Sequence, residues 1–169
     1  MHDRPARPVP PLPLYTAEQR RRRDASKWTL VQGVLAPLQF LVFLVSLWLI
    51  LRYLATGDGW LAATVSIVAK TFVLYAIMIT GSLWERDVFG RYLFAAPFFW
   101  EDVVSILVLA LHTAYLGALV FDALPAEHQM FLALAAYATY VVNAAQFLLK
   151  LRAARRDAPP KRAVALVAE

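Results

Sequence analysis

Four long stretches of apolar residues determine the architecture expected of this chain. They cover about residues 29–54, 60–84, 102–121 and 129–151. Each is close to the ~20 residues that an α-helix needs to cross ~30 Å of hydrocarbon. The connections within the first pair and within the second pair are short, so consecutive helices are expected to be antiparallel neighbours. The pattern predicts an all-α integral membrane protein with four transmembrane helices in an antiparallel bundle.

Turn and terminal signals divide the chain into a central domain and two tails. Residues 1–14 are rich in proline and show no apolar periodicity, which indicates a disordered tail. Thr16 and Gln19 have the spacing of a capping box, so a short helix at the membrane surface is expected to begin there. Residues 15–152 then form the four-helix membrane domain. Residues 153–169 are expected to be a second disordered tail.

Composition and charge support a membrane protein and give its orientation. The chain is 60% hydrophobic and 17% charged, with a net charge of +5. One small soluble core could not bury that much apolar surface. Because the basic residues border the apolar stretches, anionic lipid is the expected partner and nucleic acid is not. Lys and Arg concentrate in both terminal segments and in the middle loop, while the two opposite loops contain only Arg52. The positive-inside rule therefore places both termini in the cytoplasm.

Several classes of site are absent from the sequence. There is no cysteine, which excludes disulfides, thiolate nucleophiles and sulfur-based metal sites. The chain also lacks a glycine-rich phosphate loop, a nucleophile elbow and a run of metal ligands. His112 is the one histidine inside a predicted span, whereas bis-histidine haem ligation needs a pair. No protein metal site is predicted.

The few polar residues inside the apolar stretches fall on one face of each helix. At ~100° per residue, positions seven or eleven apart return to nearly the same face. On the third stretch this face carries Glu101, Ser105 and His112. The faces of the other stretches include Gln39 in the first, Lys70 in the second, and Asn143 and Gln146 in the fourth. We expect the four polar faces to meet inside the bundle.

Lys70 and His112 lie about ten residues from the ends of their stretches, near the middle of the membrane. A cation at that depth costs at least ~2.5 kcal/mol, so Lys70 needs a partner, loss of its charge or a hydrated cavity. The simpler alternatives are a structural interhelical bond for Lys70 and a neutral core histidine for His112. Gln39, Asn143 and Gln146 equally fit ordinary interhelical hydrogen bonds, worth ~0.6 kcal/mol each.

Charged residues gather at the cytoplasmic mouth of the predicted bundle, where Arg86 and Arg91 lie among several acids. Surface ion pairs explain most such clusters. Glu101 differs because its helix face continues inward to His112, and a carboxyl group removed from water holds its proton more firmly. Glu101 is therefore a candidate general acid. Asp102 points about 80° away from this face and is the second candidate.

Several runs of residues resemble the 2-vinyl bacteriochlorophyllide hydratase family of bacteriochlorophyll biosynthesis. The likeness covers about residues 14–150 and rests on residues 14–20 (LYTAEQR), 23–40 (RDASKWTLVQGVLAPLQF), 70–71 (KT), 90–95 (GRYLFA), 99–102 (FWED) and 111–115 (LHTAY). The resemblance implies addition of water across the C3 vinyl group of chlorophyllide a or a related bacteriochlorophyllide, giving a 1-hydroxyethyl group. It implies the cytoplasmic or intracytoplasmic membrane of a phototrophic bacterium, with other pigment-biosynthesis enzymes as candidate partners. No cofactor is expected, because the magnesium belongs to the substrate.

The resemblance brings no catalytic residues with it, so their roles are hypotheses from position. Glu101 would supply a proton directly or through water, with Asp102 as the second candidate. His112 would deprotonate the attacking water or bind the pigment's magnesium. The expected substrate-binding residues are Gln39, Asn143 and Gln146, which would order the water, Lys70, which would pair with a buried carboxylate or a pigment carbonyl, and Arg86 and Arg91, which would bind the pigment's propionate.

Two rival interpretations remain open at the level of sequence. In the first, the protein is a non-catalytic pigment-binding or assembly subunit of a photosynthetic complex, and His112 is a magnesium ligand. In the second, it is a small four-helix transporter in which Lys70 carries the coupling charge. The two pairs of predicted helices show no convincing inverted repeat, which is a feature of many transporters.

Overall fold

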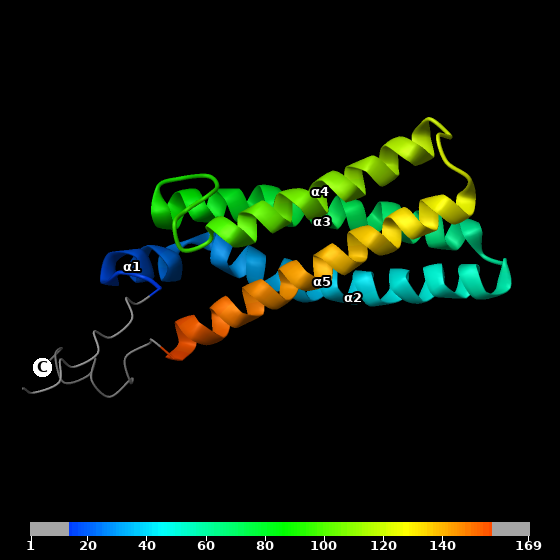
Figure 1. The fold of residues 1–169 in the computed structure, drawn as a ribbon. Helices are drawn as coiled ribbons and strands as arrows, with labels where there is room; N and C mark the ends of the chain where they lie inside the picture. The colour runs from blue at the N-terminus through cyan, green and yellow to red at the C-terminus, as the bar shows by residue number, and fades with distance from the viewer. Residues whose placement is uncertain (1–13, 157–169) are drawn as a thin grey trace, which may run out of the picture.

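A computed structural model describes residues 14–156 of the chain (Figure 1). These residues form five α-helices: α1 (Ala17–Ala25), α2 (Lys27–Thr56), α3 (Trp60–Phe89), α4 (Phe99–Val120) and α5 (Ala126–Arg156). The helices α2 to α5 are long and apolar enough to cross a membrane. The predicted all-helical class is therefore confirmed, and each of the four predicted spans coincides with a helix that could cross a membrane, which is the architecture of a multi-pass membrane protein. The predicted tails lie almost wholly outside the described residues.

Local signals in the sequence account for the ends of the helices. The Thr16 hydroxyl accepts a hydrogen bond from the Gln19 amide at 3.2 Å, and the Gln19 side chain accepts one from the Thr16 amide at 2.9 Å. This is the predicted capping box at the start of α1. Gly57 and Gly59 adopt positive φ angles of 76° and 89°, which glycine tolerates and which allow a short turn between α2 and α3. Helix α5 runs to Arg156, beyond residue 152, where the sequence placed the end of the membrane domain.

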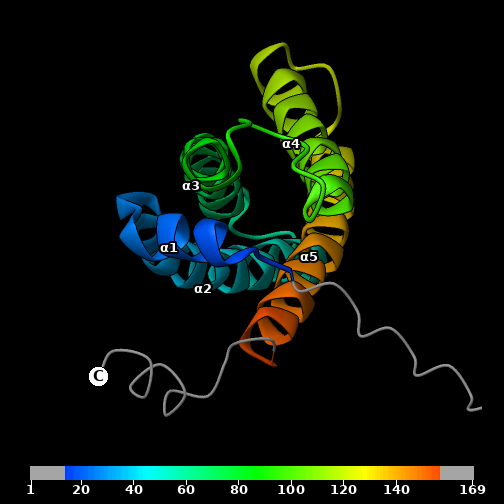
Figure 2. The same cartoon turned by 90° about the vertical axis from the view of Figure 1, so that its left-hand side faces the viewer.

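The four long helices are arranged as two pairs. Helix α2 packs mainly on α3, and α4 packs mainly on α5. Viewed from the end at which α1 lies, α2 and α3 occupy one side of the molecule and α4 and α5 the other (Figure 2). The α3–α4 loop and the end of α5 lie at this same end, which we call the loop end (Figure 1). The α2–α3 and α4–α5 connections lie at the opposite end, which we call the turn end.

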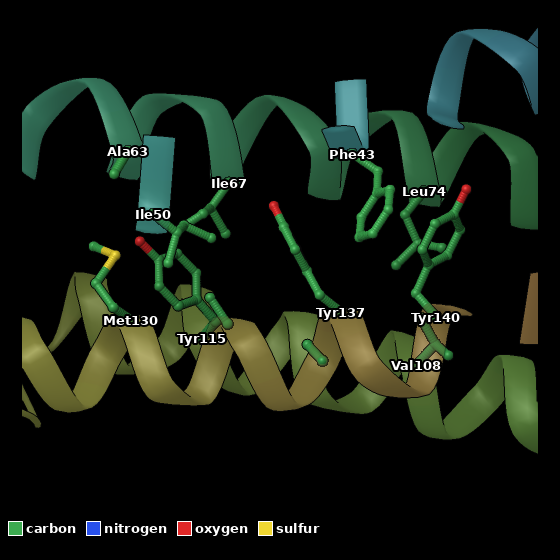
Figure 3. Close-up of a cluster of buried hydrophobic side chains, with 12 residues drawn as sticks. Phe43, Ile50, Ala63, Ile67, Leu74, Val108, Tyr115, Met130, Tyr137 and Tyr140 are labelled. Atoms are coloured by element: carbon green, nitrogen blue, oxygen red, sulfur yellow. The ribbon is translucent and has the colours of Figure 1, made fainter. Parts of the chain in front are cut away.

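Apolar and aromatic side chains fill the space in which the two pairs meet. Phe43 of α2 lies 5.4 Å and 5.1 Å, between ring centroids, from Tyr137 and Tyr140 of α5. Ile67 and Leu74 of α3 belong to the same buried cluster (Figure 3). The outward faces of these helices carry many large, exposed apolar side chains. That distribution suits a hydrocarbon environment rather than water.

Candidate active site

A lysine and a histidine form a buried pair between the two helix pairs. Lys70 projects from α3 and His112 from α4, and both side chains are 0% exposed. The Lys70 Nζ atom lies 3.1 Å from His112 Nε2. His112 Nδ1 lies 2.8 Å from the Val108 carbonyl oxygen, so Nδ1 carries the ring proton and donates a hydrogen bond to that carbonyl. Nε2 is then the acceptor, and Lys70 donates to it.

Two tyrosines of α5 complete the surroundings of this pair. The Lys70 Nζ atom lies 4.1 Å from the Tyr140 ring centroid and 5.0 Å from that of Tyr137. The His112 ring stacks on Tyr137 with a centroid distance of 5.7 Å. Aromatic faces attract a cation, most strongly where water is excluded. Among the described residues, Lys70 contacts His112 and these rings but no carboxylate. Of the two partners predicted for Lys70, a buried carboxylate is therefore not observed, and a pigment carbonyl stays a prediction.

The contacts of His112 limit the two roles predicted for it, which are deprotonation of water and binding of the pigment's magnesium. Both of its ring nitrogens have partners, the Val108 carbonyl and the Lys70 Nζ. His112 can accept a proton from water, or bind magnesium, only if Nε2 is first released. The Lys70 Nζ atom therefore occupies the place beside Nε2 that a water molecule or a magnesium ion would need.

A hydroxyl network that reaches α2 lies beside the pair. The Tyr137 hydroxyl is 2.6 Å from Ser46 Oγ, and Ser46 Oγ is 2.7 Å from Ser66 Oγ of α3. The Tyr137 side chain points from α5 across the interior toward α2 and α3 (Figure 3). Sequence analysis did not single out Tyr137, because an aromatic residue in an apolar span resembles ordinary core. The one available signal was its spacing of three residues from Tyr140, on the same helix face.

A second polar centre lies at the loop end. Glu101 is buried, and its Oε1 atom lies 3.6 Å from Lys150 Nζ. Its other oxygen, Oε2, has no hydrogen-bond partner among the described residues. Lys150 also donates to the carbonyl oxygen of Pro97. Glu101 is therefore a buried acid with one oxygen available to a further donor.

Asp102 and Glu85 hold the loop between α3 and α4. The Asp102 carboxylate accepts a hydrogen bond from the Phe94 amide at 2.6 Å, and Glu85 accepts one from the Ala95 amide at 3.2 Å. The two carboxyl groups lie close enough to interact with each other. Asp102 thus has a structural task that its position in the sequence did not reveal.

Unpaired polar atoms lie inside the bundle between the two centres. Asn143 Nδ2 donates to Ser105 Oγ at 2.8 Å, which links α5 to α4. The side-chain oxygens of Asn143, Gln146 and Gln39 are buried and lack hydrogen-bond partners among the described residues. Buried polar atoms in native proteins are generally paired, often with water. These three oxygens are therefore free to accept hydrogen bonds from groups other than the described residues.

The geometry separates some of the predicted site residues. Glu101 and His112 share a face of α4, but eleven residues at ~1.5 Å each put them ~16 Å apart along the helix. They cannot both contact one small group directly. Arg86 and Arg91 are exposed at the loop end, where the Arg86 guanidinium lies 5.0 Å from the Tyr92 ring centroid. The structure therefore unites Lys70 with His112 but leaves both arginines outside the bundle interior.

These features define a helical, multi-pass membrane protein with a polar centre enclosed at mid-depth. The family model for 2-vinyl bacteriochlorophyllide hydratase (BCHF) matches residues 15–153. The chain therefore belongs to this family, and the matched segment covers all five helices except the last residues of α5.

Two curated relatives show the same family. A 2-vinyl bacteriochlorophyllide hydratase of Cereibacter sphaeroides is 69% identical over 144 residues, which are 85% of this chain and 89% of that protein. A protein of the same name from Rhodobacter capsulatus is 64% identical over 156 residues, covering 92% of this chain and 91% of that protein. No solved structure matches the chain.

Proposed function

We propose that this protein adds water across the vinyl side chain of a bacteriochlorophyllide-type pigment. The observation that carries the proposal is the identity of 69% and 64% to two relatives named as 2-vinyl bacteriochlorophyllide hydratases. The proposed substrate group is the C3 vinyl group of chlorophyllide a, and the product carries a 1-hydroxyethyl group. Because hydration transfers no electrons to or from an external carrier, we propose that the enzyme uses no redox cofactor.

The chemistry defines what the protein must provide. A proton adds to the terminal vinyl carbon, and the π electron pair forms the new C–H bond. The cation left on the inner carbon is delocalised into the macrocycle until water attacks it and forms the C–O bond. The attacking water then releases one proton, which balances the proton consumed. The site therefore needs a proton donor, an ordered water molecule and a proton acceptor.

The Lys70–His112 pair is the proposed site of the acceptor. Its support is burial, the 3.1 Å contact and the absence of a competing carboxylate among the described residues around Lys70. Pigment binding would draw the Lys70 ammonium to a pigment carbonyl and so release His112 Nε2. His112 would then take the proton from the attacking water. Axial binding of the pigment's magnesium is the alternative use of the same released nitrogen.

Glu101 is the proposed source of the proton, acting through water rather than directly. Its distance of ~16 Å from His112 along α4 favours a relay. The unpaired side-chain oxygens of Gln39, Asn143 and Gln146 support ordered water between the two centres. Asp102 is proposed as an anchor of the α3–α4 loop, because its carboxylate already accepts the Phe94 amide.

We also propose an orientation for the protein, with the four spans forming an antiparallel bundle. The loop end would face the cytoplasm, in the cytoplasmic or intracytoplasmic membrane of a phototrophic bacterium. Its support is the concentration of Lys and Arg in α1, the α3–α4 loop and the end of α5, against Arg52 alone near the turn end. Arg86 and Arg91 would then meet the propionate of the pigment at the membrane surface.

The test is turnover of the pigment by the intact protein. Membranes of a non-phototrophic host that contain the protein are incubated with chlorophyllide a and no added cofactor, and the pigment is followed by absorption and mass. We expect the pigment to gain the mass of one water and its red absorption band to shift to the blue. Membranes that contain an equal amount of the His112→Leu protein should show neither change. Unchanged pigment that co-purifies with the protein would favour the binding subunit instead. If the protein neither binds nor converts the pigment, only the four-helix architecture would remain supported.

A further inference from the structure

Three aromatic side chains lie exposed together where the α3–α4 loop joins α4. Phe94, Phe99 and Trp100 are 37%, 44% and 69% exposed. Phe99 connects the other two, with ring-centroid distances of 5.6 Å to Phe94 and 5.4 Å to Trp100. We call these three residues the aromatic platform. Arg86 stands over Tyr92 of the same loop and, with Arg91, supplies positive charge there.

Charged side chains from three different helices fix the loop that carries the platform. Asp102 of α4 accepts the Phe94 amide, and Glu85 of α3 accepts the Ala95 amide. Lys150 of α5 donates to a loop carbonyl, that of Pro97. Both carboxyl groups are buried, a placement that is unfavourable without hydrogen-bond partners. The loop backbone supplies those partners, so its conformation is closely specified.

The backbone of Phe94 is strained in this loop. Its φ angle of 60° lies in the left-handed region, which is unfavourable for a bulky side chain. The Phe94 side chain is 37% exposed, so burial of its ring does not compensate for the backbone strain. Strained residues held by their surroundings are found preferentially at functional sites. The strained, exposed Phe94 therefore indicates a ligand that binds an outward aromatic surface.

The chemistry of the surface matches a flat, conjugated macrocycle that carries a carboxylate. Aromatic rings bind such a macrocycle by stacking and edge contacts, and arginine binds a carboxylate. Interfacial anchoring in lipid headgroups is the other use of such rings, but tryptophan and tyrosine are the residues enriched there. Two of the three platform residues are phenylalanines. The helices next to the platform, α3 and α4, are also the helices that carry Lys70 and His112.

We propose that the aromatic platform is the docking surface for the pigment, which binds there with its carboxylate on Arg86 or Arg91 before it reaches the Lys70–His112 pair. This inference rests on the proposed function, because it takes the pigment as the ligand. The pigment would then have two binding places, the platform outside the bundle and the buried Lys70–His112 pair. The platform also explains why the loop is held so firmly and why Phe94 is strained.

The test measures binding without chemistry. Purified protein in lipid nanodiscs is titrated with a chlorophyllide whose C3 substituent is ethyl, which cannot be hydrated, and binding is followed from the pigment's absorption and circular dichroism. Trp100→Leu and Phe99→Leu are expected to raise the dissociation constant about fivefold or more, as expected for the loss of one aromatic contact. The matched control is Trp48→Leu, since Trp48 is 60% exposed on α2 and lies 5.8 Å from Arg52 near the turn end. It should bind like the parent protein.

Phe94→Gly separates docking from folding. Glycine adopts the left-handed conformation without strain, so this variant should fold at least as well as the parent while binding the ethyl pigment more weakly. With the vinyl pigment, all three platform variants should raise KM and leave kcat nearly unchanged. Platform variants that bind like Trp48→Leu would overturn the docking surface. Tight binding of the ethyl pigment without hydration of the vinyl pigment would instead overturn the proposed function alone.

Discussion

Replacing Lys70 with methionine should separate catalysis from stability. Methionine keeps much of the length and apolar volume of the lysine side chain but removes its ammonium group. In the structure that group contacts His112 Nε2 and the rings of Tyr137 and Tyr140. In the proposed mechanism this ammonium group holds a pigment carbonyl, so the variant should insert and fold but hydrate the pigment very slowly, because the vinyl group is no longer positioned beside His112.

The contacts of the ammonium set the size of the expected loss of stability. A hydrogen bond to a charged group contributes ~1.5–3 kcal/mol, and a desolvated cation–π contact contributes up to ~2 kcal/mol. Placing the cation at mid-membrane depth costs at least ~2.5 kcal/mol, which opposes these gains. The net change in unfolding free energy should therefore be about 1–2 kcal/mol, including the unpaired His112 nitrogen that remains. Misplacement of the reacting group by ~1 Å lowers kcat by ~10², or about 3 kcal/mol of activation free energy.

The two quantities are measured on one preparation in mixed micelles. Unfolding by SDS is followed by circular dichroism, and kcat is measured with the vinyl pigment. The matched control is Tyr75→Phe, which removes a 2.9 Å hydrogen bond from Tyr75 to Thr113 between the same two helices at an exposed position. We expect that control to lose ~0.6 kcal/mol of stability and to keep its activity. A Lys70→Met protein that is much less stable but hydrates at the parent rate would show that the pair is structural.

Three further predictions concern other parts of the molecule. Glu101→Gln should lower kcat more than it raises KM and should change the solvent isotope effect on hydration. The control Glu18→Gln, at an exposed position, should leave kcat, KM and the isotope effect unchanged. An unchanged isotope effect in Glu101→Gln would remove Glu101 from the proton path. Asp102→Ala should lower the unfolding free energy by ~1–3 kcal/mol and open the α3–α4 loop to proteolysis, because the Phe94 amide loses its acceptor. In Asp102→Asn, which keeps an acceptor oxygen, a protease should cut this loop much more slowly. Equal cleavage of the two variants would contradict the anchoring role. Thr16→Ala removes one half of the capping box and should lower the stability of α1 by about 1 kcal/mol, seen as faster amide hydrogen exchange in α1 alone; uniform exchange across α1 and α2 would argue against an independent cap.

The positions of the helices could be predicted because each depends on signals local in the sequence. The capping-box spacing of Thr16 and Gln19 predicted the start of α1, and Gly57 and Gly59 indicated the turn between α2 and α3. The length of each apolar run set the number of spans. The ends of the spans were less accurate. Helix α3 continues five residues past the predicted residue 84, to Phe89, because a helix does not need to end where the apolar run ends.

The partners of the polar residues could be predicted only in part. Helical periodicity placed Lys70 and His112 on inward faces at similar depth, but it gives neither the rotation nor the height of α3 relative to α4. The contact between them therefore could not be distinguished from a contact with a carboxylate. The anchoring of Phe94 by Asp102 depends on a left-handed residue in an irregular loop, and a phenylalanine gives no sign of that conformation.

The order in which the helices are synthesised gives the Lys70–His112 pair a consequence for biogenesis. Helix α3 precedes α4 and α5 in the chain, so Lys70 reaches the bilayer before the second helix pair is complete. Lys70 is the one charged residue in 60–84, so the apolar residues around it must carry it into the membrane. The inserted α3 is therefore expected to be less stable until α4 and α5 supply the contacts of Lys70 with His112, Tyr137 and Tyr140.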